Sequence, residues 1–282
     1  MEIIRIPRIM QETVKGHRLR GRDVGLVPTM GALHEGHMSL VRNSMSENHY
    51  TVVSIFVNPT QFGPGEDLET YPRNIDGDVA RLRAAGVDCL FMPEADAMYP
   101  EGSATSLQMG ELAGRLCGAF RPGHFNGVAT VVAKLLNITL CTRAYFGLKD
   151  FQQYLVIKRL VSDLNIPVDV AGCATMREPD GLAMSSRNAY LNHRGERAAA
   201  TVLYRALGQG AHMLRQGGKN PSDVVQAMER IIGEEPLVTE VQYIGVYDIH
   251  TLQPLSEFTG RAVLAGAMKL GGTRLIDNVL VE

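Results

Sequence analysis

The 282-residue sequence has no tryptophan, only four cysteines and no apolar run long enough to cross a membrane. The cysteines, Cys89, Cys117, Cys141 and Cys173, lie far apart, and none belongs to a C-x-x-C pair. This spacing fits neither a disulfide framework nor a zinc site, so we interpret them as small core residues of a reducing compartment. The first five residues lack the long apolar core of a signal peptide. We therefore expect a cytoplasmic protein without a membrane partner.

The sequence also lacks a strong charge of either sign. It contains 28 Lys and Arg against 30 Asp and Glu, a net charge of −2. Such a balance provides no basic field, so we expect no nucleic-acid partner. No G-x-G-x-x-G element is present, which argues against the dinucleotide fingerprint. The composition is that of an ordinary globular protein, and the length allows one large or two ordinary domains.

Short apolar runs alternate with helical patterns in the first part of the chain. The runs lie at 24–27, 52–57, 87–92, 144–146 and 168–171. Helical spacing follows in Val128, Val131, Val132 and Leu135, and again in Ile157, Leu160, Val161 and Leu164. Apolar strands alternating with helices predict an α/β fold, a Rossmann-like doubly wound parallel sheet.

The pattern changes near residue 176. Two helices are expected at 194–214 and 222–232, joined by a Gly- and Pro-containing breaker, and three strands at 241–246, 262–268 and 275–281. Helices followed by strands, without alternation, predict a second, smaller α+β domain. We place the domains at 1–175 and 176–282.

The segment from Pro28 to His37, PTMGALHEGH, carries the clearest chemical signal. It lies where a strand would end and a helix begin, a position suited to phosphate because helix N-terminal N–H groups are unpaired there. Gly31 and Gly36 would let a ligand approach the backbone closely, and His34 and His37 could stabilise phosphate charge. The spacing is that of the HxGH element of adenylyl-transferring enzymes. A surface turn or a His-x-x-His metal pair remains possible from this segment alone.

Three further segments lie along the chain. They are FVNPTQF at 56–62, FGLKDFQQ at 146–153 and DGLAMSSRN at 180–188. Together with PTMGALHEGH, and with shorter matches that include residues 121–125 and 275–278, they resemble the pantoate–β-alanine ligase family from about residue 3 to residue 281. The family's order and spacing are kept throughout.

This resemblance implies ATP-dependent condensation of pantoate with β-alanine to give pantothenate, AMP and pyrophosphate. The pantoate carboxylate would attack the α-phosphorus, and β-alanine would then attack the resulting pantoyl adenylate. No protein nucleophile is needed, so catalysis should rest on positioning and electrostatics. The resemblance further implies Mg²⁺ with the nucleotide, and a homodimer.

By the same resemblance, His34 and His37 contact the ATP phosphates, and His37 is the preferred catalytic partner. Capping or core histidines are the alternative reading. Met30 and Gly31 would line the nucleotide cleft, although Met30 could be ordinary core. Lys149 is the third catalytic candidate, because a lysine at a helix start opposes the helix dipole unless a phosphate is bound there.

Further ATP-binding candidates are Gly147, Asp150, which could also cap a helix, and Met176 through its backbone. Leu148 stands where the family usually has Glu, which puts a side-chain role at that position in doubt. Met184, Ser185, Ser186 and Arg187 resemble the mobile KMSKS-type loop of related adenylate-forming enzymes, suited to charge on departing pyrophosphate. A plain serine-rich loop is the alternative.

By the same resemblance, Gln61 and Gln153 are the predicted pantoate and β-alanine readers, a role that suits an amide because it can donate to a carboxylate and accept from a hydroxyl. A surface glutamine is the usual alternative. Asp76 and Asp78 could assist Mg²⁺, but we assign no metal ligand. Two other function classes are a different nucleotidyltransferase on the same scaffold, which would not need the paired glutamines, and a non-catalytic metal or nucleotide binder, for which further ligands at sensible spacing are missing.

Overall fold

The computed structural model describes residues 1–191, 195–218 and 220–282. Its chain divides into two compact units. The first comprises 1–113, 121–148 and 153–174, and the second comprises 114–120, 149–152 and the chain from 175 onward. The second unit therefore includes two short stretches that precede residue 175. Hydrogen bonds explain this: Gln152 bonds the backbone of Arg115 and Cys117, and the Cys117 thiol contacts Tyr243 and Arg274.

The first unit is built on a six-stranded parallel sheet in the order β1-β4-β3-β2-β5-β6. The strands are β1 (Glu2–Ile4), β2 (Val24–Thr29), β3 (Tyr50–Ile55), β4 (Cys89–Phe91), β5 (Arg143–Gly147) and β6 (Asp169–Cys173). The helices are α1 (Pro7–Leu19), α2 (Glu35–Glu47), α3 (Ile75–Ala85), α4 (Ala95–Met98), α6 (His124–Thr139) and most of α7 (Phe151–Asp163). Short 3-10 turns form η1 (Pro59–Gln61), η2 (Glu111–Gly114) and η3 (Leu148–Asp150). The predicted Rossmann-like α/β class is confirmed.

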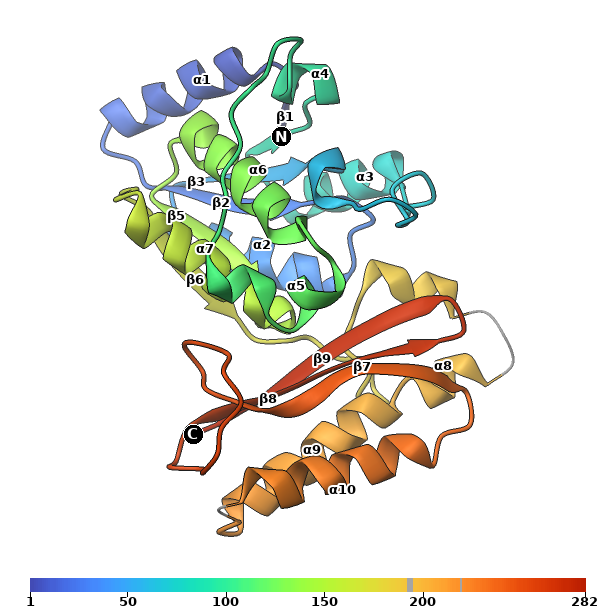
Figure 1. Ribbon diagram of the computed structural model, residues 1–282. Helices are drawn as coiled ribbons and strands as arrows, with labels where there is room; N and C mark the ends of the chain where they lie inside the picture. The colour runs from blue at the N-terminus through green and yellow to red at the C-terminus, as the bar shows by residue number, and fades with distance from the viewer. Residues whose placement is uncertain (192–194, 219) are drawn as a thin grey trace. The chain divides into compact units, whose positions relative to one another are not determined.

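Two cores cover the two faces of this sheet, because successive residues of a strand point to opposite sides. Leu26, Val52 and Phe146 join one core with residues of α1, α6 and α7. Val27, Val53 and Tyr145 join the other with residues of α2 and α3. Figure 1 shows α1, α6 and α7 in front of the sheet and α2 behind it. Burial on both faces explains why the strands are continuous apolar runs.

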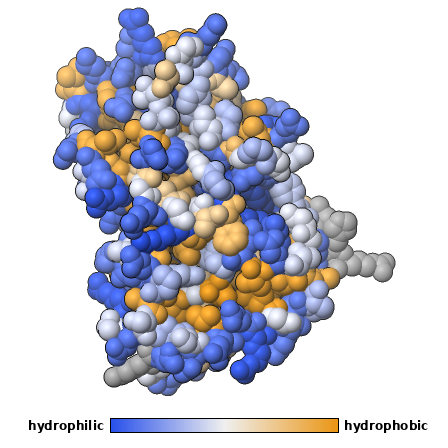
Figure 2. All heavy atoms as spheres, in the orientation of Figure 1, coloured by the Kyte–Doolittle hydropathy of each residue, from blue (hydrophilic) through white to orange (hydrophobic). Residues whose placement is uncertain are grey.

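The second unit packs helices on a three-stranded antiparallel sheet. Its elements are α5 (Cys117–Phe120), η4 (Ser186–Tyr190), α8 (Glu196–Ala199), α9 (Val202–Arg215), α10 (Pro221–Gly233), β7 (Val238–Tyr247), β8 (Ala262–Leu270) and β9 (Thr273–Val281). Helices α9 and α10 share one core with β8 and β9. A Cβ at Gly210 of α9 would lie 2.7 Å from both Leu264 and Met228, so glycine allows this close packing. Figure 2 shows hydrophobic side chains in a band where the helices of this unit meet its strands.

Two predicted helices differ in extent. The sequence that follows the PTMGALHEGH segment is helix-like from Ser39 to Asn48, but the observed helix begins four residues earlier, at Glu35, because His34 caps it. The single helix expected at 194–214 is divided into α8 and α9, and its predicted first residue, Arg194, lies outside the described residues. The division follows from Thr201, whose N–H and hydroxyl both donate to the carbonyl of Ala198 instead of continuing the helical ladder. Among the described residues, no helix combines the length and apolar character needed to span a membrane.

Candidate active site

The order of the strands places the predicted motifs at one edge of the sheet. Counting outward from β2, the chain builds β3 and β4 on one side and β5 and β6 on the other. Ligands of such sheets bind at the carboxyl ends of the strands, where this order reverses. Residues 30–37 follow β2, residues 58–61 follow β3, and Gly147 ends β5. The topology therefore brings three of the four motif segments to the switch point of the first unit.

The two motif histidines form the first turn of α2. The Gly36 N–H donates to Nδ1 of His34 over 3.1 Å, and the His34 N–H donates to Nδ1 of His37 over 3.3 Å. Their ring centroids are 4.1 Å apart. Since each Nδ1 accepts a hydrogen bond, a neutral ring carries its proton on Nε2. The capping role, which the sequence offered as an alternative, thus fixes the tautomer that can donate to a phosphate.

Asp78 of α3 holds the loop between β2 and α2. Its buried carboxylate accepts from the N–H groups of Ala32 and Leu33, both over 2.8 Å. Gly31 and Ala32 have φ of +84° and +48°, and a Cβ at Gly31 would lie 3.1 Å from Ile55. Burial raises the pKa of Asp78, although the two N–H donors oppose that rise. The carboxylate is committed to the backbone and is a poor candidate for Mg²⁺.

Gln61 is buried at the end of η1 with both ends of its amide engaged. Its Nε2 donates to the Met30 sulfur over 3.2 Å, and its Oε1 accepts from Asn58 Nδ2 over 3.1 Å. Asn58 is almost fully buried and also donates to the carbonyl of Gly127. Its Oδ1 accepts from the hydroxyl of Tyr99 over 2.9 Å. The structure therefore joins two predicted residues, Met30 and Gln61, directly, and an asparagine that we had not assigned holds the other end of the Gln61 amide.

A second chain of polar groups fixes the backbone of Gln61. Arg121 pairs with Glu66 and donates Nη1 to Nε2 of His124 over 3.0 Å. Because arginine only donates, that nitrogen must accept, so His124 donates Nδ1–H to the Gln61 carbonyl over 2.8 Å. Burial alone would raise the pKa of Glu66, but the hydrogen bonds and charge of Arg121 outweigh it and lower the pKa. Arg121 and His124, to which we gave no role from sequence, anchor the predicted substrate reader.

The remaining predicted nucleotide residues belong to the second unit. Lys149 and Asp150 lie in η3, and the Lys149 carbonyl accepts from Asn278 Nδ2 over 2.8 Å. The Met184 N–H donates to the Met176 carbonyl over 3.0 Å, which closes the turn containing Gly181. Ser185 caps η4 by accepting from the N–H of Arg187 over 3.3 Å, and Ser186 is the first residue of that turn. These contacts give the predicted loop a defined backbone.

The two neighbouring glutamines of α7 differ in environment. Gln152 is buried, accepts from the Cys117 N–H over 3.0 Å and donates to the Arg115 carbonyl over 2.7 Å. Gln153, the predicted substrate reader, is half-buried. Leu148 packs over β6, since a Cβ at Gly172 would lie 2.7 Å from its Cδ2. At this position the side chain contributes packing.

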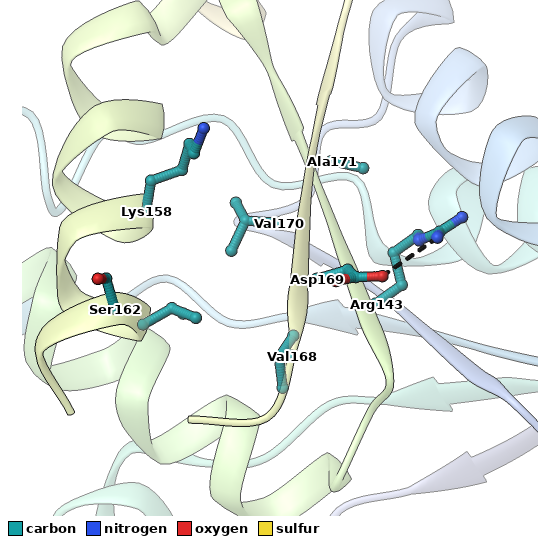
Figure 3. Close-up of a pocket in the computed structure, with 8 residues that line it drawn as sticks. Arg143, Lys158, Ser162, Val168, Asp169, Val170 and Ala171 are labelled. Carbon is teal, nitrogen blue, oxygen red and sulfur yellow. Dashed lines mark hydrogen bonds and ion pairs between the residues drawn. The ribbon is translucent and has the colours of Figure 1, made fainter. Parts of the chain in front are cut away.

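The predicted site coincides neither with a cluster of metal-ligating residues among the described residues nor with a cavity found in the first unit. Within residues 1–191, 195–218 and 220–282, no three His, Cys, Asp or Glu residues cluster in a way that could hold a metal ion. A cavity of about 450 Å³ lies between α7 and β6, lined by Lys158, Ser162 and Asp169 among others (Figure 3). None of the predicted site residues lines it.

Comparisons with known proteins agree with the motif assignment. The family model described as pantoate-beta-alanine ligase matches residues 2–280. The chain is 54% identical to a pantothenate synthetase of Thermodesulfovibrio yellowstonii, with both chains fully covered. A pantothenate synthetase structure from Thermus thermophilus matches with TM-score 0.94 and 45% identity over 99% of each chain. A pantoate-beta-alanine ligase structure from Francisella tularensis, complexed with beta-gamma ATP and beta-alanine, matches with TM-score 0.77 and 36% identity, over 99% of this chain and 97% of that one.

Gly127→Ala should destabilise the protein, because a Cβ there would clash with the backbone carbonyl of Thr60 in η1. We expect a loss of about 1–3 kcal/mol in the free energy of unfolding, measured by urea denaturation, and weaker pantoate binding. Gly208→Ala is the matched control, because the space around Gly208 in α9 is open. That change should stabilise by up to about 1 kcal/mol. Equal effects of the two substitutions would contradict the close contact between α6 and η1.

Proposed function

The chain belongs to the pantoate–β-alanine ligase family, and from this premise we propose how its own residues join pantoate to β-alanine with ATP. The observation that carries the proposal is the pair of histidines, His34 and His37, that cap the N-terminus of α2. Both rings carry their proton on Nε2 when neutral, because Nδ1 of each accepts a hydrogen bond. They lie at the N-terminus of α2, which follows β2, the strand at which the order of the sheet reverses. Donors and a positive helix end at that place suit a polyphosphate.

The reaction runs through an acyl adenylate. A pantoate carboxylate oxygen attacks the α-phosphorus of ATP, the bond to the bridging oxygen breaks, and pyrophosphate leaves. The β-alanine amine then attacks the pantoyl carbonyl, loses a proton and expels AMP. Every covalent step takes place between substrates, so the protein contributes orientation and charge stabilisation.

Residues after β2 and β5 bind the nucleotide. His34 and His37 donate Nε2–H to phosphate oxygens. His37 stabilises the negative charge that develops on the phosphate during adenylyl transfer. Met30 and Gly31 line the cleft, in a loop whose shape Asp78 maintains. Gly147 allows close approach at the end of β5.

Residues of the second unit also have proposed nucleotide roles. Lys149 neutralises phosphate charge, and Asp150 contacts the ribose. Ser185, Ser186 and Arg187 stabilise the departing pyrophosphate through hydroxyl and guanidinium donors. Met184 lies in the same loop, and the backbone of Met176 binds the adenine.

Gln61 and Gln153 recognise pantoate. The amide of Gln61 is already oriented by Asn58 and Met30, which reduces the entropy lost when substrate binds. Gln152 is occupied by the backbone of residues 115–117. Because the Gln152 amide already bonds the backbone, Gln153 is the better candidate for the amide of α7 that contacts substrate.

The remaining proposals concern metal, assembly and compartment. Mg²⁺ enters with ATP and is held by phosphate oxygens and water, which agrees with the commitment of Asp78 to backbone N–H groups. We infer a homodimer from family membership and cytoplasmic localisation from the four free, buried cysteines.

The route itself is tested by isotope exchange. Labelled pyrophosphate should enter ATP when pantoate is present and β-alanine is absent, because adenylation is reversible and does not need the amine. Product analysis should show AMP as the only nucleotide formed in the full reaction. Exchange that required β-alanine, or formation of ADP and phosphate, would rule out the acyl adenylate.

His37→Ala and Lys149→Ala should each slow pyrophosphate exchange by about 10²- to 10³-fold, since each removes a donor aimed at phosphate charge. Capture of pre-formed pantoyl adenylate by β-alanine should change much less. The matched controls are His212→Ala at an exposed position of α9 and Lys158→Ala at an exposed position of α7, which should leave both half-reactions intact. Equal damage to the two half-reactions would assign His37 and Lys149 to folding or adenylate binding.

Gln153→Ala should raise the KM for pantoate about ten- to a hundredfold, because a partner of a charged carboxylate is lost. ATP binding, measured calorimetrically without pantoate, should stay nearly unchanged. Gln61→Ala should behave similarly and also slow β-alanine capture. Gln226→Ala on exposed α10 is the control. Normal pantoate affinity combined with weakened ATP binding would reverse our assignment of these amides.

A further inference from the structure

Arg177 connects three segments of the second unit. Its guanidinium forms a bidentate pair with Asp277 of β9, at 2.6 and 2.9 Å. The same side chain donates to the carbonyl of Gly181 over 3.1 Å and to that of Asn278 over 3.3 Å. Asp277 is 4% exposed and Arg177 19%. One side chain therefore ties the turn before the 184–187 loop to the middle of β9.

The turn at Gly181 has little room to move. Arg177 lies 3.7 Å over the ring of Tyr204 in α9, and a Cβ at Gly181 would come within 2.7 Å of the same ring. Gly181 has φ of +94°, which disfavours any side chain there. The loop thus begins from a backbone position that Tyr204 and Arg177 define together.

Asn278 extends this connection to Lys149. Its Nδ2 donates to the Lys149 carbonyl over 2.8 Å, and its own N–H donates to Asp277 over 2.8 Å. The bond ends on the backbone of the residue whose ammonium is proposed to bind phosphate. Asn278 therefore holds Lys149, and Arg177 ties the turn that precedes the 184–187 loop to Asp277 and Asn278.

We propose that Arg177, Asp277 and Asn278 form a positioning clamp that sets the Lys149 ammonium and the 184–187 loop against one polyphosphate. This proposal rests on the phosphate roles given above for Lys149 and the loop. A buried ion pair is a poor source of stability, because desolvation offsets its attraction, but its bidentate geometry fixes orientation. Small displacements of groups around a reacting centre cost much rate, which is what such a clamp would prevent.

The test compares Asn278→Ala, Lys149→Ala and the double variant in pantoate-dependent pyrophosphate exchange. Asn278→Ala should reduce exchange about ten- to a hundredfold, with little effect on capture of pre-formed pantoyl adenylate. Lys149→Ala keeps its backbone carbonyl but has no ammonium to misplace. Adding Asn278→Ala to it should therefore cause no further loss. Asn278→Asp, similar in shape but unable to donate, should reproduce Asn278→Ala and serves if the alanine variant does not fold.

Asn137→Ala is the control, because Asn137 also donates its amide to a backbone carbonyl but lies exposed on α6. Exchange as in the parent protein for Asn278→Ala, a multiplicative loss in the double variant, or equal loss in both half-reactions would overturn the clamp. These outcomes leave the proposed function standing. Absence of pantoate-dependent exchange in the unmodified protein would overturn the proposed function and the clamp together.

Discussion

The buried carboxylate of Asp78 makes the interactions on which the loop between β2 and α2 depends. Between β2 and α2 the chain passes through two residues of positive φ, and its N–H groups cannot join the sheet. Unpaired N–H groups in a buried place are costly, and Asp78 accepts two of them. The loop carbonyl of Leu33 is in turn bound by Arg81 of the same helix, over 2.6 Å. Helix α3 therefore determines where α2 begins, and with it where His34 and His37 stand.

In this site one side chain combines a structural role with a proposed chemical role, through different atoms. A histidine cap would ordinarily explain an imidazole at a helix start without reference to a ligand. Here the cap uses Nδ1 of each ring and thereby defines the protonation of Nε2. The cap occupies one nitrogen of each ring, and the proposed phosphate contact would use the opposite nitrogen. The two readings of the motif that the sequence left open are compatible.

The sequence predicted strands β2 to β6 as short apolar runs but not β1. It identified the motif residues by their resemblance to the family and, after β2, β3 and β5, also by their places at strand ends. It did not predict what supports them. Asn58 and Asp78 act on residues distant in the chain, and an isolated Asn or Asp carries no periodicity that would reveal such a partner. The Asn-Pro pair after β3 was the available signal for Asn58, because proline ends the ladder and leaves the preceding side chain to bond locally. The break between α8 and α9 was missed because Thr201 competes with the helix through its own hydroxyl.

Gln61 illustrates why this chemistry needs such support. An enzyme without a covalent nucleophile depends on how well its polar groups are ordered before the substrate arrives. The side chain of Gln61 is held by Asn58 and Met30, and its backbone carbonyl by His124. His124 can donate there only because Arg121, a donor alone, occupies its other nitrogen, and Glu66 holds Arg121. Folding thus holds both the side chain and the backbone of Gln61. In the role proposed for Gln61, the binding energy of a small hydroxy acid is then left for orienting its carboxylate.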